Sequence, residues 1–203
     1  MVPDSEGIIL AAGFSSRTGV FKPELPFGGK KLLERVIEAM TDSCSRIILV
    51  GGHNFPRVKE IGEQYPQVRV IHNENYREGM FSSVQAGVRE IIPLPGKAFF
   101  IIPGDFPMVP AEIYKKLRQA MSDSDQEINI FIPVYQGRKG HPVLFRKRTA
   151  AEIVNEPADS MLKTIVRRNP CTLVNVDHDG ILKDVDTMED YENLIKNMPD
   201  FTT

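Results

Sequence analysis

Short apolar runs alternate with segments of helical period along the first 120 residues, and this alternation constrains the fold more than any other feature. Most runs are rich in Ile, Val or Phe and are bounded by Gly, Pro, Asn or Asp, as strands are. They cover residues 8–12, 46–50, 68–72, 98–102, 129–135, 142–145 and 171–175. The unbroken runs at 8–10 and 99–102 are typical of strands buried on both faces.

Apolar side chains recur at intervals of three or four residues between several of these runs. The three stripes are Leu32, Leu33, Val36, Ile37 and Met40; Val84, Val88, Ile91 and Ile92; and Ile113, Leu117 and Met121. Strand and helix in alternation predict an α/β fold with a mostly parallel sheet flanked by helices. The segment QGRKG at 136–140 predicts a hairpin tip, and residues 187–198 predict a last helix capped by Asp186 or Thr187.

Length, charge and cysteine content exclude several classes of protein. The 203 residues carry 25 Lys+Arg against 27 Asp+Glu, a formal net charge of −2, so broad electrostatic binding to nucleic acid is not expected. No linker or repeat divides the chain, which predicts one domain over residues 1–203. Cys44 and Cys171 lack any metal-binding spacing and are interpreted as reduced thiols.

The sequence gives no sign of a membrane or secretory segment. No apolar stretch approaches the roughly 18–20 residues that a membrane span needs. The N-terminus, MVPDSE, is acidic, whereas a signal peptide begins with basic residues. We therefore expect a cytoplasmic protein with no membrane partner.

The first candidate site is the segment LAAGFSSRTG at residues 10–19, which follows the first predicted strand and is followed by Lys22. Small residues let a ligand approach the backbone closely, and main-chain amides can then hold phosphate oxygens. Arg17 adds a bidentate fork and Lys22 a mobile point charge. The segment has neither the Walker nor the Rossmann glycine pattern. A plain glycine-rich turn is the alternative. The candidate nucleotide-binding residues are Leu10, Ala11, Ala12, Gly13, Arg17 and Lys22.

The second candidate is Asp105, in the segment GDFPMV at 104–109 that follows the apolar run at 98–102. Open α/β sheets bind ligands at the carboxyl ends of their strands. One carboxylate, together with waters and substrate phosphates, is the usual way in which proteins hold Mg²⁺. The alternative is that Asp105 only caps the helix expected near Glu112.

Two further segments carry polar groups next to glycines. Gly79 allows close approach, and Ser82 and Ser83 offer hydroxyls near a helix N-terminus that suit a base or ribose, with a simple helix cap as the alternative. Gly140 and His141 follow the predicted hairpin tip. His141 alone is weak evidence for a functional site, because a histidine with a purely structural role is the more frequent case.

These segments together resemble the nucleotidyltransferases with a MobA-like fold, and within them the molybdenum cofactor cytidylyltransferases. The resemblance runs from Gly7 to about Leu194, with five motifs in the expected order. They are LAAGxSxRxG with its Lys and Leu-Pro, GDxPxV, GxxxSxxxG, GxxG[HN]PVLF and DIDTPEDY. The sequence departs from the family pattern at Thr18 (usually Met), Phe106 (often Gln) and Met188 (Pro).

The resemblance implies a Rossmann-like fold of the nucleotide-diphospho-sugar transferase type and a set of roles. Arg17 and Lys22 would hold the triphosphate and the leaving pyrophosphate. Asp105 would bind Mg²⁺, with Asp186 as the favoured second ligand and Asp184 as the other candidate, since alternation puts both on one side of an extended segment. The Gly79–Ser83 stretch would lie on the base side, and Gly140 and His141 on the acceptor side.

The implied reaction joins a nucleoside triphosphate to a phosphorylated acceptor and releases pyrophosphate. The GTP-using relatives open with Leu-Ala-Gly-Gly, whereas this chain has Ala12 in that motif, so CTP is favoured. The expected acceptor is molybdopterin in its molybdenum cofactor form, with a molybdoenzyme as a possible recipient of the product. The alternatives are a GTP-using guanylyltransferase, a sugar- or polyol-phosphate nucleotidyltransferase, and a non-catalytic carrier of the finished cofactor.

Overall fold

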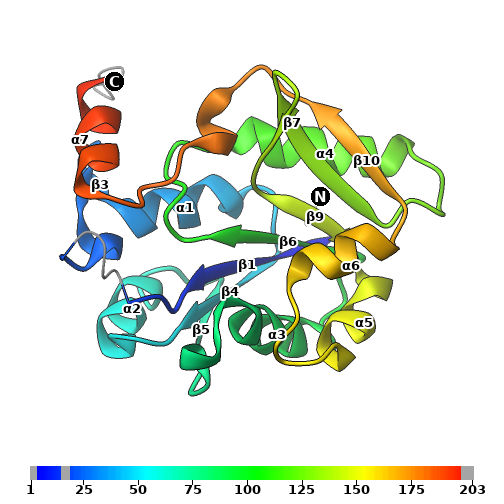
Figure 1. Cartoon of the computed structure of the whole chain (residues 1–203), viewed down its shortest axis with the longest axis horizontal. Helices are drawn as coiled ribbons and strands as arrows, with labels where there is room; N and C mark the ends of the chain where they lie inside the picture. Colours follow the sequence, from blue (N-terminus) through cyan, green and yellow to red (C-terminus); the bar gives the residue numbers. More distant parts are fainter. Residues whose placement is uncertain (1–3, 15–18, 198–203) are drawn as a thin grey trace.

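An eight-stranded sheet forms the centre of the computed structural model, which describes residues 4–14 and 19–197 (Figure 1). Its order is β10-β7-β9-β6-β1-β4-β5, with β8 paired to β7. The strands are β1 (Ser5–Ala11), β4 (Arg46–Gly51), β5 (Val68–His72), β6 (Ala98–Pro103), β7 (Ile130–Tyr135), β8 (Arg138–Lys139), β9 (Val143–Arg146) and β10 (Cys171–Asn175). A separate hairpin pairs β2 (Pro26–Phe27) with β3 (Lys30–Lys31).

The sheet is mostly parallel, as the alternation of strands and helices predicts. The pairs β1–β4, β1–β6, β4–β5 and β7–β10 are parallel, and only β8 and β9 run against their neighbours. The predicted hairpin tip at 136–140 is shorter in the structure, because Arg138 and Lys139 already pair with β7. The tip is Gln136 and Gly137, whose φ angles of 48° and 78° are those of a tight two-residue turn.

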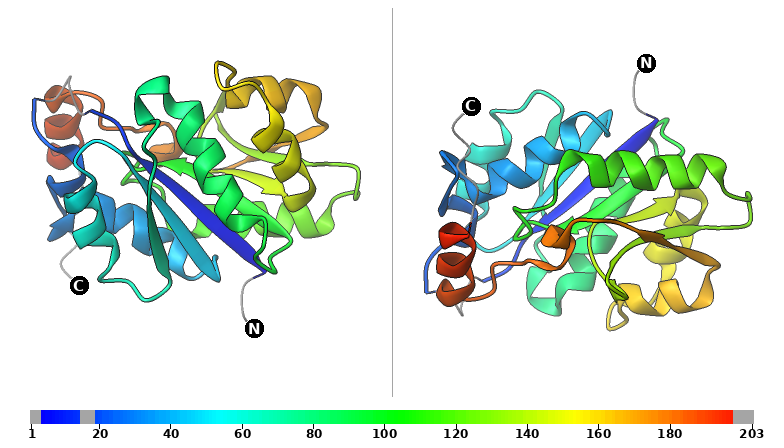
Figure 2. Two further views of the ribbon diagram at one scale, coloured as in Figure 1. Left: turned by 90° about the horizontal axis from the view of Figure 1, so that it is seen from below. Right: turned by 90° about the horizontal axis from the view of Figure 1, so that it is seen from above.

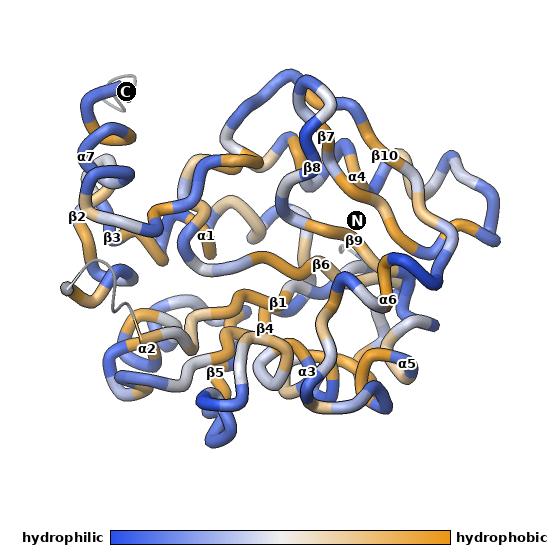
Figure 3. The backbone as a smooth tube through the Cα atoms, in the orientation of Figure 1, coloured by the Kyte–Doolittle hydropathy of each residue, from blue (hydrophilic) through white to orange (hydrophobic). Residues whose placement is uncertain are grey.

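Helices cover both faces of the sheet (Figure 2). They are α1 (Leu32–Thr41), α2 (Phe55–Gly62), α3 (Met80–Ile91), α4 (Ala111–Asp123), α5 (Ala150–Asn155), α6 (Leu162–Arg168) and α7 (Met188–Lys196). The apolar sides of α1, α2 and α4 share one core, and those of α3, α5 and α6 share the other. The apolar segments gather along the central strands in Figure 3. Among the described residues, no helix combines the length and apolarity needed to cross a membrane.

The first strand begins earlier than its apolar run predicts. Ser5 and Glu6 belong to β1 and are fully buried. One carboxylate oxygen of Glu6 accepts a hydrogen bond from the Gly96 amide at 2.7 Å, while the other, Oε2, has no partner. Burial raises the pKa of Glu6. Local hydrophobicity could not show this, because the carboxylate is accommodated by a loop 90 residues away.

The chain reverses its direction of travel across the sheet beside β1. From β1 it proceeds to β4 and β5 on one side, and then returns to β6 on the other. Loops leaving the carboxyl ends of β1 and β6 therefore diverge and leave a crevice, which is where open α/β sheets bind ligands. Figure 1 shows these two strands side by side at the centre of the sheet.

The C-terminal segment returns to the same end of the sheet. Val185 is fully buried with Phe27 and Leu32, and its amide donates a hydrogen bond to the Asp105 carbonyl at 2.9 Å. Helix α7 follows, with Thr187 as the N-cap and Asp190 completing a capping box. Of the two caps that the sequence allowed, the structure uses Thr187. The helix ends at Lys196, two residues before the predicted end at 198, which lies outside the described residues.

Candidate active site

A cleft of about 640 Å³ lies at the crevice between β1 and β6. The candidate residues that line it come from every predicted motif. They are Leu10, Ala11, Ala12, Gly13, Lys22, Gly79, Ser83, Asp105, His141, Asp184 and Asp186. The fold thus brings together segments that begin at residue 10 and end at residue 186.

Three candidates stand apart from this set. The Ser82 hydroxyl donates to backbone carbonyls of its own turn and is not a lining residue. Gly140 lies against the Ile181 backbone, where a Cβ atom would clash with the carbonyl. It is also not a lining residue, so its role is to let the neighbouring segments approach. Arg17 lies outside the described residues.

The ammonium of Lys22 is shared by two acidic side chains. Its Nζ lies 2.8 Å from Oδ2 of Asp105 and 3.5 Å from Oδ1 of Asp186. It also donates a hydrogen bond to the Val185 carbonyl at 2.8 Å. The side chains of Lys22 and Asp105 are 15% and 24% exposed, so solvent screens this pair only partly, whereas Asp186 is 43% exposed and its contact is screened more. The short helix η1 (Lys22–Glu24), with Pro23 buried, fixes the backbone from which this side chain extends.

Asp184 and Asp186 both line the cleft because the residue between them is an anchor. Val185 is buried, so alternation along the extended segment turns its two neighbours the other way. Burial raises the pKa of Asp184, and the nearby carboxylates of Asp105 and Asp186 raise it further. The site therefore concentrates negative charge that a cation would relieve.

Asp105 and Asp186 fit the donor set of a hard divalent cation, because both offer carboxylate oxygens in one cleft. Among residues 4–14 and 19–197, no group of three or more His, Cys, Asp or Glu side chains is arranged to hold a metal by itself. This arrangement suits an ion that takes only one or two protein carboxylates and completes its shell with substrate phosphates and waters.

The turn before α3 is held by a buried asparagine. Asn73 donates through its side-chain amide to the hydroxyls of Ser82 and Ser83, each at 2.9 Å, and accepts from the Asn75 amide. Gly79 has a φ of 108°, a conformation that favours glycine, and it begins the helix at the cleft wall. The serine hydroxyls thus shape this turn, and Ser83 is the one that lines the cleft.

His141 is also one of the residues that line the cleft. Burial lowers the pKa of His141 to about 4, although the Asp105 carboxylate and a hydrogen bond with the Ile101 backbone raise it. The imidazole is therefore neutral near pH 7. Its Nδ1 is buried without a hydrogen-bond partner, and its ring meets Phe106 edge-on with centroids 4.9 Å apart.

An aromatic cluster at the rim of the cleft was missed by sequence reasoning. The Phe14 ring lies 5.1 Å from His53 and 5.2 Å from Tyr76 between centroids, and the Arg77 guanidinium stands 5.6 Å from the Tyr76 ring. Tyr76 packs against Gly52, where an added Cβ would come within 2.6 Å of Tyr76 and 2.9 Å of Ala12. The only sequence signal was that Phe14 lies within the segment at 10–19 and that Tyr76 lies just before Gly79.

Comparison with known proteins places this site in a family. The family model of the MobA-like NTP transferase domain matches residues 7–173. The chain belongs to the MobA-like NTP transferase family. Membership agrees with the resemblance carried by the sequence motifs and makes the chain a nucleotidyltransferase.

Two curated members of the family illustrate its range. The molybdenum cofactor cytidylyltransferase of Escherichia coli (strain K12) is 30% identical over 184 residues, which cover 91% of this chain and 92% of the relative. A probable molybdenum cofactor guanylyltransferase of Bacillus cereus is 28% identical over 135 residues, which cover 66% of this chain and 63% of the relative.

Solved structures share the MobA-like fold. Rv0371c from Mycobacterium tuberculosis H37Rv superposes with a TM-score of 0.82 at 22% identity, over 97% of this chain and 100% of that chain. The same protein solved as a complex with manganese gives a TM-score of 0.74 at 20% identity, over 96% and 99% of the two chains. At these identities the likeness establishes the fold.

Proposed function

We propose that this protein transfers the CMP group of CTP to a molybdopterin-type phosphorylated acceptor and releases pyrophosphate. The observation that carries the proposal is the shared ammonium of Lys22, which stands between Asp105 and Asp186 in the crevice beside β1 and β6. A cation and two carboxylates at this position suit a substrate that brings a triphosphate and a divalent metal together.

In the proposed reaction, an acceptor phosphate oxygen bonds to the α-phosphorus of the nucleotide, and the bond from that phosphorus to the bridging oxygen breaks. The leaving pyrophosphate takes the electron pair, so no protein nucleophile is needed. Lys22, together with Arg17, orients the triphosphate and balances the charge that develops on the leaving group. Such transfers depend on positioning and electrostatics more than on covalent chemistry.

Asp105 and Asp186 are the residues that would hold Mg²⁺, with Asp184 close by as an additional negative charge. A bound divalent ion would neutralise phosphate charge and polarise the phosphoryl group. The protein's own part is to fix the two carboxylates: the Val185 amide bonds to the Asp105 backbone, and the buried Val185 side chain docks the segment.

CTP is the proposed nucleotide because of the space around Ala12. Its methyl group stands next to Gly52 and Tyr76, at the point where the loop after β1 meets the aromatic cluster. A one-ring base needs less room there than a two-ring base. The cytidylyltransferase relative spans nearly the whole chain, whereas the guanylyltransferase relative aligns over about two thirds of it, which supports the same choice.

The acceptor is proposed to enter from the side of His141, across the cleft from Ala12. The whole chain would act as one domain, and a molybdoenzyme would receive the product. The test is a pyrophosphate-release assay with CTP or GTP, run with molybdenum cofactor and with a panel of sugar and polyol phosphates. Release that requires both CTP and the molybdenum cofactor is expected. If pyrophosphate is released with GTP and the molybdenum cofactor but not with CTP, the nucleotide is GTP and the proposed base is wrong. Release with a sugar or polyol phosphate instead would correct the acceptor, and no release with any pair would favour a carrier.

A further inference from the structure

A second cavity, of about 430 Å³, adjoins the nucleotide cleft and has an almost wholly apolar wall. It lies between the first turn of α3, the ends of β1 and β6, and residues 158–162, which lead into α6. Five residues line both cavities, so the two are neighbours with a common wall: Leu10, Gly79, Met80, Pro103 and His141. A ligand in one can therefore contact a ligand in the other.

Two methionines flank this cavity although both are exposed to solvent. Met80 is 65% exposed and Met161 is 61% exposed, on different segments of the wall. Among the described residues seven large apolar side chains are exposed, and the two most exposed of them meet here. A thioether side chain is flexible and polarisable, and it contacts aromatic faces favourably. Exposed methionines at the mouth of an apolar cavity are therefore suited to a flat ring system.

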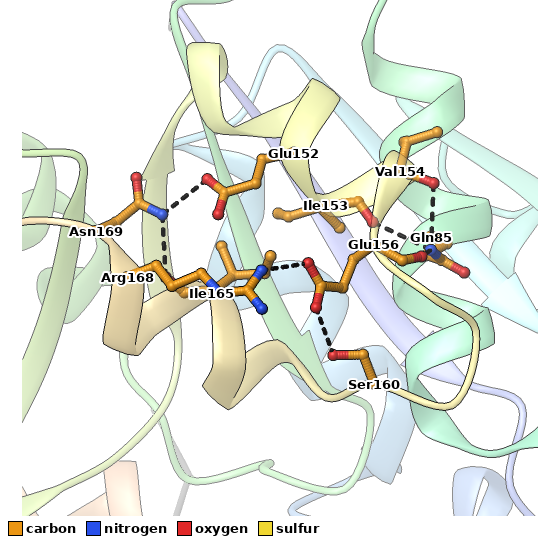
Figure 4. A network of polar contacts seen from close by, with 9 residues as sticks. All are labelled: Gln85, Glu152, Ile153, Val154, Glu156, Ser160, Ile165, Arg168 and Asn169. Atoms are coloured by element: carbon orange, nitrogen blue, oxygen red, sulfur yellow. Dashed lines mark hydrogen bonds and ion pairs between the residues drawn. The ribbon is translucent and has the colours of Figure 1, made fainter.

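The wall that carries Met161 is fixed by a polar network (Figure 4). The Gln85 side-chain amide of α3 donates to the carbonyls of Ile153, Val154 and Glu156, at 3.1, 3.3 and 2.8 Å. The Glu156 carboxylate in turn accepts from the Ser160 hydroxyl at 3.0 Å and from Arg168 at 2.7 Å. These bonds tie α5 and the segment before α6 to the helix that forms the nucleotide side, so the cavity is formed before a ligand arrives.

His141 forms part of the wall that the two cavities share. Its Nδ1 atom has no hydrogen-bond partner and no accessible surface, so a ligand in either cavity does not reach that atom in this arrangement. The second cavity therefore offers a ligand mainly apolar contact, which suits the faces of a flat ring.

We propose that this second cavity takes the planar heteroaromatic ring system of the acceptor, the part that lies away from its reacting phosphate. This assignment rests on the proposed function. The cavity lacks the cations that a phosphate needs, so neither the triphosphate nor the acceptor phosphate belongs in it. Its place beside the carboxylate-lined cleft lets an acceptor put its ring between Met80 and Met161 while its phosphate reaches the nucleotide.

The test uses a phosphate-free ring, 6-hydroxymethylpterin, whose fluorescence reports binding without turnover. Met161→Asp places a charge on the apolar wall, and Met80→Asp repeats the change on the facing segment. Met161→Leu keeps the wall apolar, and Leu173→Asp, at an exposed position of β10 away from both cavities, is the matched control. Folding of each variant is checked by thermal unfolding.

The parent should bind the pterin, and both Asp variants should bind it at least about tenfold more weakly. In steady-state assays Met161→Asp should raise KM for the phosphorylated acceptor by a similar factor and leave KM for CTP unchanged, because Met161 lines only the second cavity. Met80→Asp should also raise KM for the acceptor, but Met80 lines the nucleotide cleft as well, so the KM for CTP is compared only in Met161→Asp. Met161→Leu and Leu173→Asp should behave as the parent. Failure of the parent to bind the pterin, or equal binding by the folded Asp variants, overturns the assignment.

The two proposals can fail separately. A parent that transfers CMP to the molybdenum cofactor, but whose pterin binding ignores Met80 and Met161, keeps the function and loses this cavity as the ring site. A parent that binds the pterin in a Met161-dependent way, yet transfers no nucleotide to that acceptor, keeps the ring site and loses the proposed acceptor reaction.

Discussion

The Nζ atom of Lys22 lies 2.8 Å from Oδ2 of Asp105, although 83 residues separate the two in the sequence. Lys22 is the first residue of the short helix η1, and Asp105 follows β6. The same ammonium reaches Asp186, so one cation balances carboxylates from two other segments. Removing any one of the three changes the charge that the other two experience.

Replacement of Asp105 by Asn should remove a metal ligand and keep the fold, because the side chain is at a strand end and not in a core. We expect kcat to fall by at least about 10²-fold, the scale of losing a main electrostatic stabiliser. The measurement is pyrophosphate release at saturating substrates, with thermal unfolding as the check on folding. Asp177→Asn, at a fully exposed position, is the control. A folded Asp105→Asn enzyme with parental kcat would exclude the metal role.

Replacement of Lys22 by Ala should weaken nucleotide binding and turnover together, each by at least about tenfold, since charge develops on the leaving pyrophosphate. Lys22→Arg should not restore activity, because a planar fork cannot take the place of a point charge held by three acceptors. Lys97→Ala, at an 80% exposed position, is the matched control. Unchanged KM for CTP and unchanged kcat in Lys22→Ala would make Lys22 a purely structural residue.

Replacement of Ala12 by Gly should relax the choice of base. One methyl group discriminates by about 1–3 kcal/mol, or roughly 10–200-fold in kcat/KM, and its removal should admit GTP without abolishing CTP use. The measurement is kcat/KM for both nucleotides with one acceptor. A parent enzyme that already prefers GTP would reverse the base assignment.

Gly52→Ala is the converse change, because it adds a methyl group on the side of the contact that faces Ala12 and Tyr76. An added methyl would come within 2.6 Å of Tyr76 and 2.9 Å of Ala12, so one of them must shift. We expect kcat/KM to fall for CTP and GTP alike. A selective loss of one nucleotide would mean that Gly52 itself reads the base.

Replacement of Glu6 by Gln should change how stability depends on pH. Burial raises the pKa of Glu6 in the folded chain, so the folded state holds the proton more tightly than the unfolded state does. The resulting stabilisation is complete below the unfolded pKa of about 4.3 and is lost as pH rises through the folded pKa. Urea unfolding from pH 4.5 to 8 should show the parent losing stability relative to Glu6→Gln. Glu63→Gln is the control, because Glu63 is exposed and pairs with Lys59 at the surface; the stability of this variant should depend on pH as that of the parent does.

Replacement of Gln85 by Met should destabilise the chain, because the buried amide donates to the carbonyls at the end of α5 (Figure 4). Each carbonyl left without a partner costs about 1–3 kcal/mol. Three carbonyls share this one donor, so we expect the free energy of unfolding, measured in urea, to fall by at least about 1–3 kcal/mol. Gln119→Met, on the exposed face of α4, should cost little. Equal effects of the two changes would show that the network adds no stability.

The sequence alone predicted the sheet and the main segments of the site. Strand positions followed from apolar runs, and helices α1, α3 and α4 from apolar stripes, because burial on a sheet imposes a local period. The carboxyl ends of parallel strands meet at one edge, so Ala12, Lys22 and Asp105 were expected near one another from their places after predicted strands. Alternation about Val185 was enough to pair Asp184 with Asp186.

Tertiary structure decided what depends on partners far apart in the chain. Ser82 seemed available to a ligand until its hydroxyl was seen bonded to carbonyls of its own turn. The buried carboxylate of Glu6, the tilted ring contact of Phe14 with Tyr76 and the apolar cavity beside Met161 have no local pattern. Each of these features is made by side chains from separate segments. The spacing of apolar residues along the chain shows which face of a segment is buried, but not which groups from other segments pack against that face.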